Sequence, residues 1–258
     1  MIQRTFLQQL TEEGSKTMRV LAIDSSGLTA TVAVVEDEQT IAEYTVNYKK
    51  THSQTLLPMI DEVKKMIDLD LSSIDAVAVS GGPGSFTGLR IGSATAKGLG
   101  LALGKPLIHV PTVDALAYNV YGCGDLICPI MDARRKQVYT GIYRYEDHRL
   151  VTVKDQMAVG IEELLSMLNE MGETVTFLGD GVPVFKDIIA DKLEVPFSFA
   201  PSHLSRQRAG AVGALGILYY KEGRTETAAE HKPDYLRVSQ AERERAQRLK
   251  KESEGEKA

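Results

Sequence analysis

The sequence predicts an α/β fold made of two duplicated halves, each with the element order βββαβα. Two observations predict it. A short apolar run that stops at an aspartate occurs twice, ending at Asp24 and at Asp132, and each run is followed by the same succession of elements. The 258 residues are enough for one large domain or for two small ones that share a cleft.

The first half is expected over residues 18–118. Apolar runs mark its strands, and Leu56, Ile60, Val63 and Ile67 lie at the three- and four-residue spacing of a helix. The expected elements are strands at 19–23, 29–35 and 40–47, a helix at about 53–68, a strand at 76–80, a helix ending near 103 and a strand at 107–110.

The second half is expected over residues 119–237 and repeats the opening pattern. Its expected elements are strands at 126–131, 137–145 and 149–153, a helix at 161–171 and a strand at 174–178, before a Gly-Asp-Gly loop at 179–181. Residues 1–17 are predicted to be an extension outside the fold, with Met18 as the true start. Residues 238–258 are predicted to be a charged tail.

Composition excludes several classes of protein. The 30 Lys and Arg residues against 35 Asp and Glu give a net charge of -5, so unaided binding to RNA is not expected. Cys123 and Cys128 are too few for a disulfide framework and are expected to be reduced thiols. Because no apolar run has the length of a membrane span and residues 1–17 lack a signal-peptide pattern, a cytoplasmic protein is expected.

A glycine-rich loop between a strand and a helix is the sharpest local motif. Residues 80–90 read Ser-Gly-Gly-Pro-Gly-Ser-Phe-Thr-Gly-Leu-Arg. Glycines let the backbone approach an anion, and free amides at a helix start attract negative charge. The loop lacks the Lys-Ser or Lys-Thr of a Walker A motif, and a tight strand-to-helix turn explains it equally well.

The organisation of residues 18–237 resembles the actin-like, Hsp70-like fold of the ribonuclease H type, in which two related halves hold a nucleotide between them. The resemblance implies that the aspartates ending the first strand of each half face one cleft, whereas spacing alone favours turn formers or helix caps. The candidate residues of a degenerate nucleotide cleft are Asp24, Ser25, Gly82, Gly84, Ser85 and Asp132.

Three separated segments look like the TsaB family. They are the Gly-Gly-Pro-Gly-Ser-Phe-Thr-Gly-Leu-Arg-Ile-Gly stretch at 81–92, Met-Asp-Ala-Arg-Arg-Lys-Gln-Val-Tyr at 131–139 and Pro-Asp-Tyr-Leu-Arg at 233–237. The resemblance implies a non-catalytic partner of TsaD, which transfers a threonylcarbamoyl group from an adenylate to adenosine in transfer RNA. It also implies a TsaD-like protein as heterodimer partner, a TsaE-like ATPase joining them, tRNA contact only through the complex, and homodimers when the chain is alone.

The sequence departs from the TsaD pattern where that family carries a metal-binding His-x-x-x-His pair. On that alignment Thr112 and Leu116 stand in place of the two imidazoles, and neither can replace a nitrogen ligand. The five histidines are scattered, with no two at i and i+4, so no metal site and no catalytic residue are expected. No cofactor is expected on the chain alone, with ATP or ADP at most at the interface of the complex.

Two helices of the first half are the expected partner surface. Between Phe86 and Leu103 the only charged residues are Arg90 and Lys97, so one sheet cannot cover every apolar face of that helix. Burial within the monomer is the alternative. The interface candidates are Leu57, Met59, Met66, Ile91, Ala94 and Thr95, with Met59 expected to be accessible to the partner.

Rival functions remain open at this point. An ATP-dependent small-molecule kinase or phosphatase would use the same superfamily fold and would bind nucleotide without a partner. A glycoprotease-like peptidase would need the missing metal ligands. A homodimeric scaffold that acts alone is a third alternative.

Overall fold

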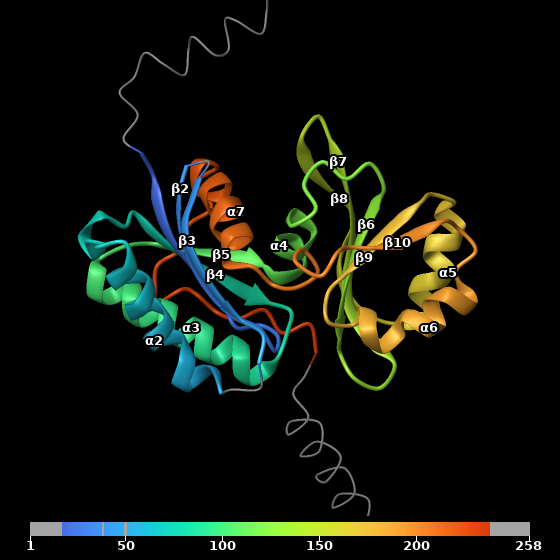
Figure 1. The fold of residues 1–258 in the computed structure, drawn as a ribbon, viewed down its shortest axis with the longest axis horizontal. Helices are drawn as coiled ribbons and strands as arrows, with labels where there is room; N and C mark the ends of the chain where they lie inside the picture. Colours follow the sequence, from blue (N-terminus) through green and yellow to red (C-terminus); the bar gives the residue numbers. More distant parts are fainter. Residues whose placement is uncertain (1–16, 38, 49–50, 238–258) are drawn as a thin grey trace, which may run out of the picture.

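The computed structural model describes residues 17–37, 39–48 and 51–237, so nearly all of the predicted N-terminal extension and the whole 238–258 tail lie outside the described residues. The described chain forms two halves side by side, each built around one five-stranded sheet (Figure 1). Within these ranges, no helix combines the length and the apolar character that crossing a bilayer requires.

The first sheet has the strand order β3-β2-β1-β4-β5. Its three N-terminal strands pair antiparallel, and β4 and β5 continue the sheet parallel to β1. The elements are β1 (Arg19–Asp24), β2 (Ala30–Glu36), β3 (Gln39–Val46), α2 (His52–Met66), the 3-10 turn η1 (Leu71–Ser73), β4 (Ala76–Gly82), α3 (Phe86–Leu103), β5 (Leu107–Pro111) and α4 (Thr112–Tyr118).

The second sheet repeats this topology, with the order β10-β9-β6-β7-β8 and the same alternation of antiparallel and parallel pairs. Its elements are β6 (Leu126–Asp132), β7 (Gln137–Glu146), β8 (Arg149–Gly160), α5 (Ile161–Met171), β9 (Val175–Leu178), α6 (Val182–Lys192), β10 (Phe197–Phe199) and α7 (Ala209–Lys221). The predicted α/β fold with two duplicated halves is therefore confirmed.

Both faces of the first sheet are buried. Along β1, Leu21 and Ile23 face the core under α2 and α3, whereas Val20 and Ala22 face the core under α7. This alternation follows from the two-residue period of a strand. It explains why the strand is apolar throughout rather than amphipathic.

The last helix of each half packs against the sheet of the other half. Helix α7 follows the second sheet in sequence, yet it packs on β1 and β2 of the first (Figure 1). Helix α4 follows the first sheet, and its Val113, Leu116 and Ala117 share a core with β6 and β7. The division into 18–118 and 119–237 stays a prediction, but the packing of these helices follows the burial of the sheet faces rather than chain order.

A buried carboxylate also links the halves. Asp114 on α4 accepts hydrogen bonds from Tyr143 on β7 at 2.7 Å and from Tyr219 on α7 at 3.0 Å. Burial is the main cause that raises the pKa of Asp114. It is also the main cause that raises the pKa of both tyrosines. The bonds give α4 and α7 a common polar contact with the second sheet.

Close contact of α7 with the first sheet depends on its glycines. A Cβ added at Gly213 would lie 2.5 Å from Val35 Cγ2, whereas nothing lies within 4 Å of one added at Gly98 on α3. We therefore expect Gly213→Ala to lower the free energy of unfolding by about 1–3 kcal/mol through overpacking. Gly98→Ala should raise it by about 0.5–1 kcal/mol by restricting the unfolded chain. Urea unfolding measures both, and equal stabilisation by the two would contradict this packing.

Candidate functional site

A cleft of about 330 Å³ opens between the two halves. Its volume is at the low end of small-molecule pockets. The first half contributes Ser26, Gly27, Leu28, His52, Gly84 and Ser85, and the second contributes Met131, Asp132, Ala133, Arg134, Tyr139 and Asp180. Three of the six cleft candidates from the sequence, Gly84, Ser85 and Asp132, line it.

Gly84 and Ser85 bring the start of α3 to the cleft. The Ser85 amide donates to the Ser26 carbonyl at 2.6 Å, and a Cβ at Gly84 would lie 2.4 Å from that same oxygen. The Ser85 hydroxyl caps α3 by accepting from the Gly88 amide at 3.3 Å. Glycine at 84 is therefore required by the close approach of the first strand-to-strand turn.

Asp24 does not face the cleft. Its carboxylate is fully buried and accepts from the amide and hydroxyl of Ser26 at 2.8 and 2.7 Å and from the Ser80 hydroxyl at 2.5 Å. Burial raises its pKa, against the effect of these hydrogen bonds. Asp24 thus joins the ends of β1 and β4 inside the first half, which is the structural role that spacing alone favoured.

Ser25 and Gly82 also lie behind the cleft wall. The Ser25 hydroxyl donates to the Gly88 carbonyl at 2.9 Å, which anchors α3 to the β1–β2 turn. Gly82 has a φ of +126° and would place a Cβ 2.2 Å from the Asp234 carbonyl oxygen. Both positions serve backbone packing rather than a ligand.

Two aspartates of the second half face the cleft. Asp132 accepts from the Arg134 amide at 2.8 Å and pairs with the Arg134 guanidinium at 3.0 Å, while its own amide donates to Asp180 Oδ1 at 3.2 Å. Burial raises the pKa of Asp180. Two carboxylates at one mouth repel a bare phosphate, so a phosphate here would need a cation between them.

The turn after Asp132 is strained. Arg134, Arg135 and Lys136 all have positive φ, at 66°, 56° and 56°, which costs roughly 1–2 kcal/mol at each non-glycine residue. Asp132 and a hydrogen bond of 2.6 Å from Arg237 to the Ala133 carbonyl hold the turn. Strain of this kind persists only where surrounding contacts enforce it, and it is common at functional sites.

Residues 232–237, which we call the C-terminal strap, join the glycine-rich loop to the second half. The Asp234 amide donates to the Gly81 carbonyl at 2.6 Å, and its carboxylate accepts from Gln156 at 2.7 Å. Tyr235 stacks on Phe86 with ring centroids 4.2 Å apart. The segments 81–92, 131–139 and 233–237 thus lie together. The sequence did not predict this arrangement, because the segments are far apart in the chain.

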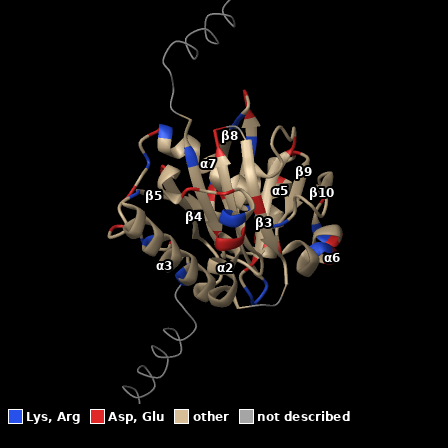
Figure 2. Cartoon of the chain, turned by 60° about the vertical axis from the view of Figure 1, so that its left-hand side comes forward, with Lys and Arg blue, Asp and Glu red and all other residues tan. Residues whose placement is uncertain are grey.

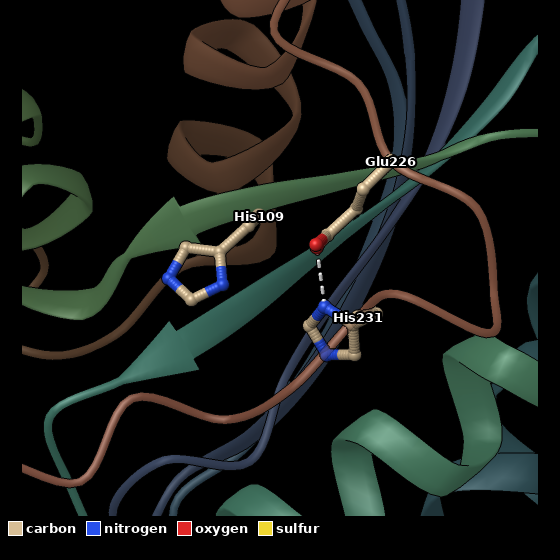
Figure 3. A group of neighbouring side chains, drawn as sticks. All are labelled: His109, Glu226 and His231. Carbon is tan, nitrogen blue, oxygen red and sulfur yellow. Dashed lines mark hydrogen bonds and ion pairs between the residues drawn. The ribbon is translucent and has the colours of Figure 1, made fainter.

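Thr112 and Leu116 on α4 are both buried and belong to no polar cluster of the cleft. A second polar group lies beside β5. His109, Glu226 and His231 place one donor atom each within 4.8 Å of one another (Figure 3). Burial lowers the pKa of His109, which keeps its imidazole neutral at pH 7. Sequence spacing gave no sign of this group, because its two histidines, His109 and His231, are far apart in the chain.

A groove of about 790 Å³ runs between α2 and the edge strand β3 and contains some of the interface candidates. Leu57 on α2 and Met66 at the groove are 58% and 76% exposed. Met59 also lines the groove but is only 4% exposed, since it packs with Leu56 and Val63 in the core. The expectation that Met59 is an accessible contact is wrong, because its helical position falls on the core stripe.

The remaining candidates lie on α3. Ala94 is exposed, while Ile91 and Thr95 are half-buried, and the Thr95 hydroxyl donates to the Ile91 carbonyl at 2.9 Å. The ribbon of α3 is tan in Figure 2 apart from short blue segments, as expected from its two charged residues. Apart from Arg90 and Thr87 near its start, the exposed side of α3 is therefore apolar or small, and its inner side packs on the sheet.

Comparisons with known proteins agree on one family. The family model described as "TsaD: tRNA N6-adenosine threonylcarbamoyltransferase" matches residues 39–245. The Bacillus subtilis protein named "tRNA threonylcarbamoyladenosine biosynthesis protein TsaB" is 35% identical, over 87% of this chain and 96% of its own. The Escherichia coli protein of the same name is 29% identical, over 85% and 95%.

A solved structure has the same fold. The structure titled "YeaZ from Pseudomonas aeruginosa" superimposes with a TM-score of 0.73 and 25% identity, covering 85% of this chain and all of that one. The similarity therefore extends over both halves.

The different surroundings of Asp24 and Asp132 predict different effects of the same substitution. Asp24→Asn should lower the free energy of unfolding by about 1–3 kcal/mol, because it removes buried charge-assisted hydrogen bonds. Asp132→Asn should lower the free energy of unfolding by less than about 1 kcal/mol, because its ion-pair partner Arg134 is solvent-exposed. The asparagine Oδ1 can still accept the hydrogen bond from the Arg134 amide. Chemical denaturation measures both. Equally small losses would show that Asp24 does not hold β1 and β4 together.

Proposed function

Because this chain belongs to the TsaB family, we propose that it is the non-catalytic partner of a TsaD-like protein in the threonylcarbamoyladenosine modification of transfer RNA. One observation carries the proposal: identity to a relative named TsaB extends over nearly the whole length of both chains. In this proposal the TsaD-like partner transfers the threonylcarbamoyl group from its adenylate, and a TsaE-like ATPase joins the pair.

The positions of Thr112, Leu116 and Asp24 favour a structural rather than a catalytic role for this chain. The residues aligned with the metal-binding histidines of TsaD, Thr112 and Leu116, are fully buried. Asp24, which precedes the cleft residue Ser26 by two positions, accepts hydrogen bonds from Ser26 and Ser80 inside the first half. The proposed contribution of the chain is to hold its partner in a competent shape, with ATP or ADP at most at their shared interface.

The charge of the chain supports indirect contact with the substrate. With a net charge of -5, the chain has no overall attraction for a polyanion, so the proposed tRNA contacts belong to the partner or to the assembled complex. Because tRNA is the proposed substrate, the proposed location is the cytoplasm.

The groove between α2 and β3, together with the outer side of α3, is the proposed docking surface. It combines exposed apolar side chains on α2 with an open sheet edge. Apolar groups that a partner can desolvate are typical of the centre of an interface. In the absence of the partner, the same surface would support a homodimer.

Reconstitution tests the function. The purified chain alone should not modify tRNA and should bind ATP weakly or not at all. Addition of a TsaD-like protein, a TsaE-like ATPase and the adenylate-forming enzyme should produce threonylcarbamoyladenosine, and omission of this chain should abolish it. Mass spectrometry of digested tRNA detects the product. Turnover by the chain alone, or product formation that does not need it, would disprove the proposal.

Substitution of two exposed apolar residues of α2, Met66 in the groove and Leu57 outside it, tests the docking surface. Leu57→Glu and Met66→Glu should each weaken binding to the TsaD-like partner about tenfold or more, because a carboxylate would be desolvated in an apolar contact. Val184→Glu is the matched control, since Val184 is 55% exposed on α6 of the second half. Calorimetry gives the affinities, and thermal melts should show three folded variants. Equal affinity of all three would place the interface elsewhere.

A further inference from the structure

Two segments far apart in the sequence bring together His109, Glu226 and His231. Glu226 is fixed opposite the start of β5, because its amide and carbonyl exchange hydrogen bonds of 3.0 and 2.9 Å with Leu107. His109 lies two residues after Leu107, so its side chain is on the same face of the strand. A turn from Thr227, closed by the His231 amide at 3.1 Å, returns His231 to Glu226.

The three donor atoms converge. Glu226 Oε1 lies 2.5 Å from His231 Nδ1, and one ring nitrogen of His109 is turned toward the other two side chains (Figure 3). The two imidazole rings are not stacked; their centroids are 5.8 Å apart and their planes differ by 53°. Tetrahedral ligands with bonds of about 2.0–2.2 Å lie roughly 3.4 Å apart. That separation lies between the 2.5 Å of the Glu226–His231 pair and the 4.8 Å within which all three donor atoms fall.

The surroundings orient both imidazoles. His231 is fully buried, and its Nε2 is 2.6 Å from the Ser93 hydroxyl on α3, so an ion would enter between Nδ1 and the Glu226 carboxylate that Nδ1 contacts. A metal-binding histidine usually has its other nitrogen fixed in this way. The ring of His109 lies over Gly81, where a Cβ would be 2.1 Å from Cε1, so only glycine there permits this ring position.

An ion pair between Glu226 and His231 would account for two of the three residues but not for the third. Within the described ranges, the ring of His109 makes no hydrogen bond, although it is half-buried and lies beside both groups. Two imidazoles and one carboxylate form a ligand set that proteins use for zinc, with a fourth position left for water or another ligand.

We propose that His109, Glu226 and His231 bind a divalent transition-metal ion of the zinc class. The site is separate from the interhalf cleft and from the positions of Thr112 and Leu116. The ion would fix the chain after α7 to β5 and α3, immediately before the C-terminal strap crosses the glycine-rich loop. Its role is thus to hold the strap in place, with one coordination position open.

Metal titration of the full chain, freed of any affinity tag and treated with a chelator, tests the site. One Zn²⁺ should bind per chain in competition with a chromophoric chelator, and Co²⁺ should give the visible absorption of a tetrahedral site. His109→Asn should abolish that absorption and weaken Zn²⁺ binding more than tenfold. Ser93→Ala should weaken it about 10–100-fold, the range typical of a lost outer-shell partner.

Controls separate this site from adventitious binding. His148→Asn removes a histidine at the β7–β8 turn, and Cys123→Ser removes the half-buried thiol; neither should change the stoichiometry or the spectrum. Zn²⁺ should also raise the melting temperature of the wild type but not of His109→Asn, which melts as a folded protein without metal. Absence of stoichiometric binding by the full chain, or equal affinity in His109→Asn, would overturn the proposal.

Discussion

The fold depends on the reciprocal exchange of the last helix of each half. A strand in the middle of a mixed sheet is apolar on both faces and must be covered on both. Helices α2 and α3 cover one face of the first sheet, and α7, which comes after the whole second sheet, covers the other. Since α4 in turn packs on β6 and β7, neither half buries its own sheet completely. Each half therefore depends on a helix of the other half to bury its sheet, although the two sheets are separate and have the same topology.

The polar groups between the halves follow from this exchange. At the junction, Tyr143 of β7 and Tyr219 of α7 both donate hydrogen bonds to Asp114 of α4. The C-terminal strap makes a second connection, because Asp234 contacts both Gly81 and Gln156. The cleft mouth is thus bordered by covalently distant segments that mutually restrict their motion. A partner that docks on α3 would act on a helix that is anchored to the β1–β2 turn by the hydrogen bond from Ser25 to Gly88.

Much of the architecture could be predicted from the sequence, because β1 to β9 and helices α2, α3 and α5 have clear apolar periods or runs. Helix α7 could not, since Ala209–Lys221 is apolar on nearly all sides and so has no amphipathic period. The site was predicted in part. An aspartate at a strand end can be located from the sequence, but the direction of its side chain cannot. The sequence therefore did not predict that Asp24 turns inward to Ser26 and Ser80. His109 and His231 meet only through tertiary structure, which a search for closely spaced ligands does not detect.

The late position of α7 has a consequence for synthesis on the ribosome. A nascent chain that has emerged up to residue 200 contains every residue of the core beneath α5 and α6, so the second sheet can acquire that core at once. The first sheet, although translated earlier, must wait for Ala209–Lys221 before its second face is covered. Until then an apolar sheet face remains open to solvent and to other chains. The N-terminal half is thus made first and finished last, and a product truncated before residue 209 would expose the surface on which chaperones and proteases act.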